Sequence, residues 1–248
     1  MTAITVEFDS ASLTYPIFGG GATFRGMLAD RVWTRGANSA PLSFAALRDV
    51  TFTAREGDRV ALVGANGAGK TTLLRMISGI YAPASGSAKV YGSVLPLLGH
   101  MPGINPDATG YENIKLAAYT IGLDRAHVPA VTRDVAEFTE LGSFLQMPLK
   151  TYSAGMSARL LFGVITAFKA DVYALDEFSF SAGDHAFKER AQQRALLLME
   201  QAKTIFLASH DDDILRRVCN RALYLEAGRV VADGPVDEVL ERYHKAER

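Results

Sequence analysis

Residues 64–71 read GANGAGKT and match G-x-x-x-x-G-K-[ST], the spacing of a loop that binds phosphate groups. An apolar run typical of a buried strand, RVALVG, leads into the loop, and TTLLRMISGI, which has helical character, follows it. A glycine-rich turn could precede a helix by chance, but strand, loop and helix together favour a phosphate site. The residues expected to bind nucleotide phosphates are Gly64, Asn66, Gly67, Ala68, Gly69, Lys70, Thr71 and Thr72.

Four side chains around this loop could act directly on a nucleotide. Lys70 can reach the β- and γ-phosphates, and the Thr71 hydroxyl can hold Mg²⁺. Asp176 and Glu177 end the mostly apolar segment DVYALDE. We expect Asp176 to hold the same Mg²⁺ ion, and Glu177 to position or deprotonate the attacking water as a catalytic residue. Without the upstream loop, a strand ending in two solvated acids would be the better explanation.

A histidine follows another expected strand. His210 comes directly after TIFLAS, at the carboxyl end of that strand, where ligands gather in open α/β sheets. We therefore expect His210 to be a catalytic residue that contacts the γ-phosphate region. The alternative is a structural or surface role, which is commoner for a lone histidine.

The segment TYSAGMSARL, residues 151–160, has the features of a second helix start shaped for an anion. Ser153 stands where a helix N-cap belongs, and Gly155 permits a close approach to the backbone. Apolar residues at helical spacing follow. The segment contains no lysine to grip a phosphate, although the chain already has one complete phosphate loop.

Strand and helix patterns alternate along most of the chain, which predicts an α/β fold. We expect one domain, with a core at about residues 1–98 and 169–248 and a mostly helical lobe at about 99–168. The expected strands lie near residues 4–8, 46–53, 59–64, 87–92, 171–177 and 204–209, with two more around Gly228. The expected helices lie near residues 71–80, 111–121, 128–141, 184–203 and 211–219, with a last one from Pro235.

Composition limits the function classes. The chain has 248 residues and a formal net charge of -1, which gives no electrostatic reason to expect a nucleic-acid partner. Its single cysteine excludes an internal disulfide. We expect neither a signal peptide nor a membrane-spanning segment, because no apolar run approaches about 18 residues. Work at a membrane would then require another chain to hold this one there.

The order of phosphate loop, helical insert, YSAGM, acidic strand and histidine resembles the ATP-binding subunit of ABC transporters over nearly the whole chain. The resemblance implies a P-loop ABC-type nucleotide-binding domain with a mixed sheet core and a helical lobe, and ATP and Mg²⁺ as cofactors. In that family the signature segment, usually LSGGQ, completes the nucleotide site of the other subunit. Ser153 and Gly155 keep this pattern, and Tyr152, Ala154 and Met156 depart from it. The resemblance therefore implies a homodimer with two shared sites.

A narrower resemblance points to the subgroup that exports capsular polysaccharide, O-antigen and teichoic acid. It rests on GINPDATGYENI and on the segment from FTELGSF through the signature helix. It implies a membrane permease as partner, and a peripheral location on the cytoplasmic face of the bacterial inner membrane through that permease. SLTYP matches the nucleotide-stacking position of the subgroup, so Tyr15 is the expected adenine platform. A packing role at a strand edge is the alternative for Tyr15.

Two segments depart from the pattern of the family, and the role of a third is undecided. VLPLLGHMPG lacks the Gln or Glu expected before the lobe, and Gly99 and His100 stand nearest to that position. Asp184 resembles the aspartate of the loop that crosses the dimer interface, one position later than the family spacing. Residues 16–43 have no clear strand period. They contain a possible helical face, which either packs on its own domain or touches the membrane surface or permease: Phe24, Met27, Leu28 and Val32.

Two other function classes compete with export. A soluble ABC-type ATPase acting on nucleic acid or ribosomes would usually bear tandem cassettes, coiled-coil inserts or basic arms, and this chain shows none of these. A P-loop kinase or GTPase would leave YSAGM unexplained. We therefore expect an ATPase subunit that drives export of a lipid-linked polysaccharide, with a subunit for another substrate as the alternative.

Overall fold

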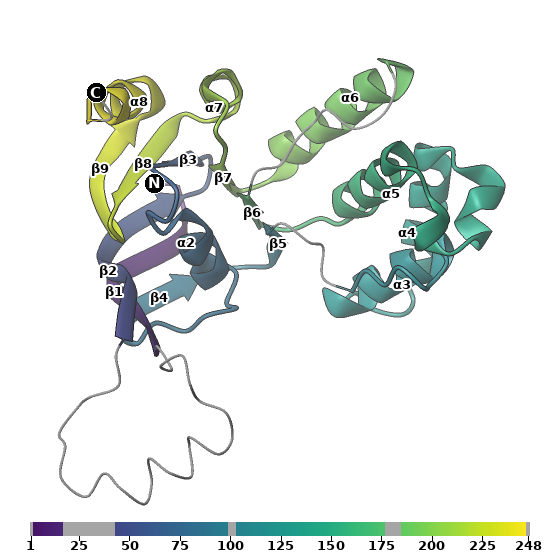
Figure 1. Ribbon diagram of the computed structural model, residues 1–248, viewed down its shortest axis with the longest axis horizontal. Helices are drawn as coiled ribbons and strands as arrows, with labels where there is room; N and C mark the ends of the chain where they lie inside the picture. Colours follow the sequence, from purple (N-terminus) through teal and green to yellow (C-terminus); the bar gives the residue numbers. More distant parts are fainter. Residues whose placement is uncertain (1, 17–42, 99–102, 177–184, 247–248) are drawn as a thin grey trace, which may run out of the picture.

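The computed structural model of the chain describes residues 2–16, 43–98, 103–176 and 185–246. Two β-sheets form the core of this part, and a group of helices stands beside them (Figure 1). No helix in the described ranges is both long and apolar enough to span a bilayer.

The larger sheet has six strands in the order β5-β6-β7-β3-β8-β9. The strands from β5 to β8 pair in parallel, whereas β9 runs antiparallel to β8, so the sheet is mixed. Its strands are β3 (Arg59–Val63), β5 (Val94–Leu98), β6 (Val172–Asp176), β7 (Thr204–Ala208), β8 (Arg221–Glu226) and β9 (Arg229–Pro235). Pro96 is tolerated in β5 because this strand lies at the edge of the sheet.

The smaller sheet is antiparallel, with the order β2-β1-β4. Its strands are β1 (Ile4–Pro16), β2 (Ser43–Arg55) and β4 (Ser85–Val90). Val6 and Phe8 are buried, as the alternation in the sequence predicts, and Phe8 stacks on Phe52 with ring centroids 4.8 Å apart. Buried side chains of this sheet form one apolar cluster with those of β3, β6 and β7, so the two sheets share a core.

Seven α-helices and two short 3-10 helices surround or extend the sheets in the described ranges. The α-helices are α2 (Lys70–Ile77), α3 (Gly110–Thr120), α4 (Val128–Thr139), α5 (Ala154–Ala167), α6 (His185–Gln201), α7 (Asp212–Val218) and α8 (Val236–Ala246). The 3-10 helices are η1 (Gly142–Gln146) and η2 (Leu149–Thr151). Leu73, Leu74 and Ile77 of α2 are buried in the cluster that both sheets share.

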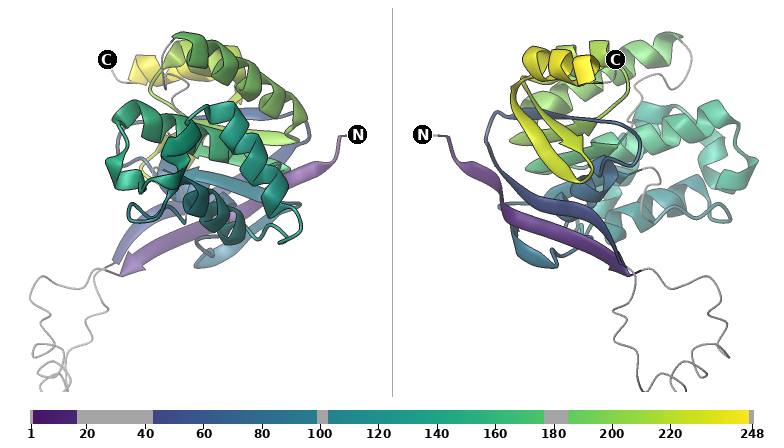
Figure 2. Two further views of the ribbon diagram at one scale, coloured as in Figure 1. Left: turned by 90° about the vertical axis from the view of Figure 1, so that its right-hand side faces the viewer. Right: turned by 60° about the vertical axis from the view of Figure 1, so that its left-hand side comes forward.

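Helices α3, α4 and α5 form the lobe, which stands beside the strands in Figure 1 and in front of them in the left view of Figure 2. Thr109 caps α3 in a capping box: its hydroxyl accepts from the Glu112 N–H, and the Glu112 carboxylate accepts from the Thr109 N–H. Gly163 lets α5 approach α4 closely, because a Cβ there would lie 2.6 Å from a methyl carbon of Thr139. Local capping and close helix contact thus fix the lobe.

Helix α6 is fastened to the lobe by an aromatic cluster. The ring centroid of Phe138 lies 5.3 Å from that of Phe187 and 5.8 Å from that of Phe162. These rings come from α4, α6 and α5, and Phe187 and Phe162 are buried. Arg190 of α6 adds a two-pronged ion pair with Glu140, which follows α4. The signature helix α5 and the helix after the acidic strand are therefore in direct contact.

Candidate functional site

The loop between β3 and α2 needs glycine at two positions. Gly64 has a φ of 145°, and a Cβ there would lie 2.2 Å from the Leu225 carbonyl oxygen. Gly69, with a φ of 112°, is the N-cap of α2 and lies against β2: a Cβ would be 3.1 Å from the Ala46 carbonyl oxygen. Both conformations favour glycine, and both positions lack space for a side chain. The glycines of the motif thus set the path of the loop.

Neighbouring strands hold this loop in place. The Gly228 N–H donates to the Ala68 carbonyl at 3.0 Å, and the Arg48 N–H donates to the Gly228 carbonyl at 2.8 Å. Gly228 is in the turn between β8 and β9, and Arg48 is in β2. Both sheets therefore support the loop.

The functional side chains of the motif point toward polar partners. The Lys70 Nζ donates to the carbonyl oxygens of Gly64 at 2.5 Å and Ala65 at 3.1 Å, so the cation lies over the loop. The Thr71 hydroxyl donates to a carboxylate oxygen of Asp176 at 2.6 Å. The fold thus brings together two residues that are 105 positions apart in the sequence.

A cavity of about 270 Å³ collects most of the expected nucleotide residues. Its lining residues come from β1, β2, the phosphate loop, α2 and the ends of β6 and β7: Tyr15, Phe44, Ala46, Asn66, Gly67, Gly69, Lys70, Thr71, Thr72, Asp176 and His210. Of the expected phosphate ligands, Gly64 and Ala68 do not line it, and their contacts instead shape the loop.

Tyr15 lies at this cavity and contacts Tyr81, which follows α2. Its ring meets that of Tyr81 edge-on, with centroids 5.7 Å apart and an interplanar angle of 77°. Partial burial raises the pKa of its hydroxyl. The hydroxyl therefore stays protonated around neutral pH, and the ring is held in place.

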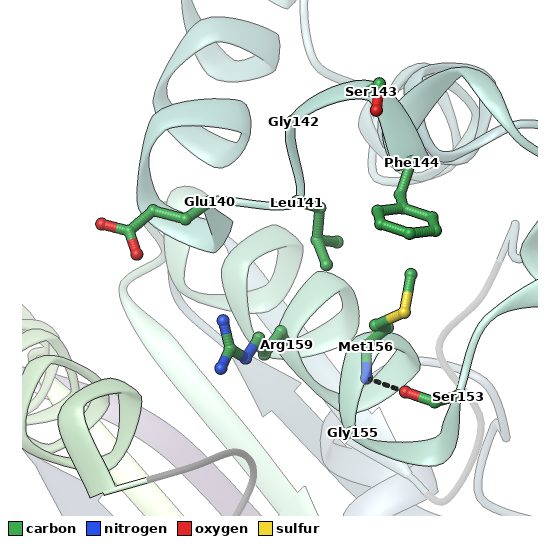
Figure 3. A pocket seen from close by; sticks show the side chains of 9 residues that line it. All are labelled: Glu140, Leu141, Gly142, Ser143, Phe144, Ser153, Gly155, Met156 and Arg159. Carbon is green, nitrogen blue, oxygen red and sulfur yellow. Dashed lines mark hydrogen bonds between the residues drawn. The ribbon is translucent and has the colours of Figure 1, made fainter.

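Ser153 and Gly155 line a different cavity, in the lobe (Figure 3). Ser153 is the N-cap of α5, and its hydroxyl accepts from the Met156 N–H at 3.2 Å, as the sequence predicts. A Cβ at Gly155 would meet no atom nearer than the Ser153 hydroxyl, 4.0 Å away. The cavity, of about 620 Å³, is lined by Glu140, Leu141, Gly142, Ser143, Phe144, Ser153, Gly155, Met156 and Arg159.

The two cavities share no lining residue. The structure thus brings Tyr15, Lys70, Thr71, Asp176 and His210 together, and leaves the signature segment of the same chain elsewhere. Other expected residues lie outside the described residues: Glu177, Asp184, Gly99, His100, Phe24, Met27, Leu28 and Val32.

Sequence reasoning missed several residues at these cavities. Phe44 and Ala46 line the nucleotide cavity, and Glu140, Phe144 and Arg159 line the cavity in the lobe. Phe44 stands in the unremarkable strand segment LSFAALRDV, where no motif separates it from a packing residue. Its register opposite Tyr15 is the signal that could have revealed it, and that register exists only once β1 and β2 are paired.

Comparison with known proteins decides the family. The model of the ABC transporter family matches residues 47–179, more than half of the chain. This chain belongs to the ABC transporter family. The match covers the phosphate loop, the signature and the acidic strand of this ABC cassette.

Two relatives and one solved structure illustrate the kinship of this ABC cassette. It is 38% identical to the teichoic acids export ATP-binding protein TagH of Staphylococcus saprophyticus, over 82% of this chain and 76% of the relative. It is 36% identical to the O-antigen export system ATP-binding protein RfbE of Yersinia enterocolitica, over 90% and 95% respectively. Its fold is similar to a dimeric ATP-binding cassette, MJ0796, bound to ADP and Pi, with a TM-score of 0.69, 18% identity and coverage of 93% and 98%.

Proposed function

We propose that this chain is the ATP-binding and ATP-hydrolysing subunit of an exporter for a lipid-linked polysaccharide. The observation that carries the proposal is the single cavity in which the phosphate loop, the Thr71–Asp176 pair and His210 meet. Family membership adds that a cassette of this kind works with ATP. The names of the relatives, which export teichoic acids and O-antigen, add the class of substrate.

The Thr71–Asp176 pair also fits a magnesium ion. A hydroxyl and a carboxylate converge to 2.6 Å, and both supply the hard oxygen donors that Mg²⁺ prefers. Within the described ranges, no three His, Cys, Asp or Glu residues cluster as a metal site. A site with two protein oxygens suits Mg²⁺, which usually keeps waters and binds phosphates of the substrate. When bound, the ion would neutralise charge on the β- and γ-phosphates.

The residues of the chain then have separate tasks. Lys70 leaves its backbone carbonyl partners and pairs with the β- and γ-phosphates, while the loop N–H groups hold the phosphate chain. His210, which follows β7 and lines the same cavity, contacts the γ-phosphate. Glu177, which follows Asp176 in the sequence, positions or deprotonates the attacking water. Positioning and electrostatics supply most of the rate in this chemistry.

The signature segment completes the site of a second copy. Ser153 and Gly155 share no cavity with the phosphate loop of their own chain. Among the described residues nothing requires glycine at position 155, since a Cβ there would meet no atom nearer than 4.0 Å, yet glycine is roughly 1 kcal/mol less favourable than alanine in a helix interior. A second copy whose nucleotide approaches the backbone at Gly155 would explain why glycine is kept there. We infer a head-to-tail homodimer with two nucleotide sites, in which Asp184 is an interface residue.

A permease must carry the polymer itself. The described part of the chain has no helix able to span a membrane, and the relatives are named as ATP-binding proteins of export systems. We infer that a polytopic membrane protein holds the chain at the cytoplasmic face of the bacterial inner membrane. ATP would close the dimer and hydrolysis would reopen it, a population shift that the permease converts into transport.

Deletion and complementation in the native cell test the proposal. Deletion should abolish the surface polysaccharide, and the wild-type gene should restore it. Lys70→Ala should fail to restore it, because the phosphates lose their main cationic partner. Lys245→Ala is the matched control, since this lysine is 78% exposed on α8, and it should restore the polymer. The tagged wild-type chain should also co-purify with a polytopic membrane protein. A polymer unaffected by deletion would contradict the export function and favour a soluble ABC ATPase.

A further inference from the structure

One aromatic side chain at the nucleotide cavity has no role in the site described so far. Phe44 is 53% exposed, whereas Ala46 and Leu47 of the same strand are buried. Its ring lines the cavity that also holds Lys70 and Thr71. The exposed ring can therefore contact a ligand held in the cavity.

The position of Phe44 is set by strand pairing. Phe44 lies directly opposite Tyr15 in the antiparallel pair of β1 and β2. Side chains directly opposite in such a pair share one face of the sheet, with Cβ atoms about 5 Å apart. Both residues line the same cavity, so both side chains can contact a ligand held there.

The cavity wall combines the phosphate loop with two aromatic residues, Tyr15 and Phe44. The Ala46 carbonyl packs against Gly69 of the phosphate loop, and Phe44 is two residues further along β2. Because a strand rises about 3.3 Å per residue, Phe44 lies one pleat away from the loop. A nucleotide with its phosphates on the loop must extend its base away from Lys70. Tyr15 and Phe44 line the cavity where this base could lie.

Tyr15 offers this base an immobile surface. Its edge-on ring contact with Tyr81, which follows α2, holds it in place. Tyr81 is held in turn by Arg75, whose guanidinium carbon lies 5.9 Å from the ring centroid. Phe44 has more exposed ring area available for a ligand, being half exposed where Tyr15 is partly buried.

We propose that Phe44 contacts the base of the bound nucleotide, next to Tyr15, so that two aromatic side chains instead of one hold the base. The inference deepens the proposed function and rests on it, since the base belongs to the nucleotide held by the phosphate loop. Stacking of a base on an aromatic side chain contributes about 5- to 100-fold to affinity, as judged by alanine substitution.

Calorimetric titration of the purified full chain tests the proposal, with two ligands that share phosphates but not a base. The ligands are ADP and inorganic tripolyphosphate, each with Mg²⁺, the latter measured by competition against ADP. Phe44→Ala should weaken ADP binding by about 5- to 100-fold and leave tripolyphosphate within twofold of wild type. Phe44→Tyr keeps an aromatic face and should retain ADP affinity. Tyr119→Ala, which removes an aromatic residue 48% exposed on α3, should change neither ligand.

Three other outcomes would contradict either the Phe44 contact or the proposed function. Unchanged ADP affinity in Phe44→Ala would refute the contact. An equal loss for both ligands would show that Phe44 only supports the loop, and would also refute it. A wild-type chain that binds neither ligand would refute the proposed function itself, so the two failures are distinguishable.

Discussion

Replacing Ser153 with alanine separates the structural role of this residue from its proposed role at the second nucleotide. Among the described residues, the Ser153 hydroxyl makes one hydrogen bond, the N-cap bond from the Met156 N–H at 3.2 Å. Loss of such a cap costs about 1 kcal/mol of unfolding free energy. For a chain of this size that lowers the melting temperature by about 2–4 °C. The folded monomer should therefore tolerate Ser153→Ala.

Thr109→Ala is the matched control for this loss. Thr109 caps α3 in the same lobe, and its hydroxyl accepts from the Glu112 N–H at 3.2 Å and donates to the Glu112 carboxylate at 2.9 Å. Removing the Thr109 hydroxyl breaks at least as many hydrogen bonds as removing the Ser153 hydroxyl does. The two variants should lose similar stability, about 1 kcal/mol each. Thr109 does not line the cavity of Ser153, so it has no proposed contact with nucleotide.

The two variants should differ in ATP hydrolysis. A hydroxyl that donates to a phosphate makes a hydrogen bond to a charged group, which is worth about 1.5–3 kcal/mol. If that bond forms in the transition state, its loss from Ser153→Ala slows hydrolysis by about 10- to 100-fold. Thr109→Ala should stay within about twofold of wild type. Steady-state phosphate release at saturating ATP measures the rates, and chemical denaturation measures the stabilities.

The refuting results are specific. Equal ATPase rates in the two variants would show that Ser153 acts only as a helix cap. A slow rate in Ser153→Ala together with weak ADP binding by the monomer would place Ser153 in the site of its own chain, against the separation of the two cavities.

Three further expectations concern the dimer, the water and the sheet. Mixing Ser153→Arg with Lys70→Ala should recover ATPase activity that neither variant has alone, because one of the two sites in the heterodimer carries both lesions and the other is intact. No recovery would argue against sharing between subunits. Glu177→Gln should still bind ATP but hydrolyse it at least about 100-fold more slowly. The variant should remain dimeric with ATP and Mg²⁺ in size-exclusion chromatography. Normal turnover would show that Glu177 is not the catalytic residue. Hydrogen bonds from Lys203 and then Ser93 lower the pKa of Asp171 to about 2, so this carboxylate adds stability above about pH 4 that is lost as the pH falls toward 2. Asp171→Asn should therefore lower the denaturation midpoint at pH 6 and converge with wild type near pH 2, and a difference that persists unchanged at pH 2 would contradict this.

Local signals in the sequence predicted most elements of this fold. The alternation at Val6 and Phe8 predicted β1, and both residues are buried. The apolar run before Asp176 predicted β6 and placed this carboxylate at the strand end. Such patterns depend on near neighbours in the chain, and so they can be read without knowing the fold. The Ser153 cap is of the same kind, since its partner is only three residues away.

Contacts that depend on pairing between distant segments could not be predicted. Phe44 gains its place at the cavity from its register opposite Tyr15, and this register shifts at an irregularity two residues before Tyr15. The sequence motif predicts glycine at position 64, but the backbone of Leu225 that excludes a side chain there lies 161 positions away. Similarly, no pattern in the sequence predicts that Phe187 would fasten α6 to the lobe.

The open space around Gly155 allows selection for a stable fold to be distinguished from selection for function at this glycine. In a mutational scan scored by cellular abundance, Gly155→Ala should be neutral or even enriched. Alanine is roughly 1 kcal/mol more favourable than glycine in a helix interior. Its Cβ would also meet no atom of the described residues nearer than the Ser153 hydroxyl at 4.0 Å. Gly64→Ala should be depleted in the same scan, because its Cβ would lie 2.2 Å from a carbonyl oxygen. Scored by surface polysaccharide, both variants should be depleted. Positions tolerated for abundance but not for polymer export would then outline the surface that this chain offers to its partners, without any structure of the complex.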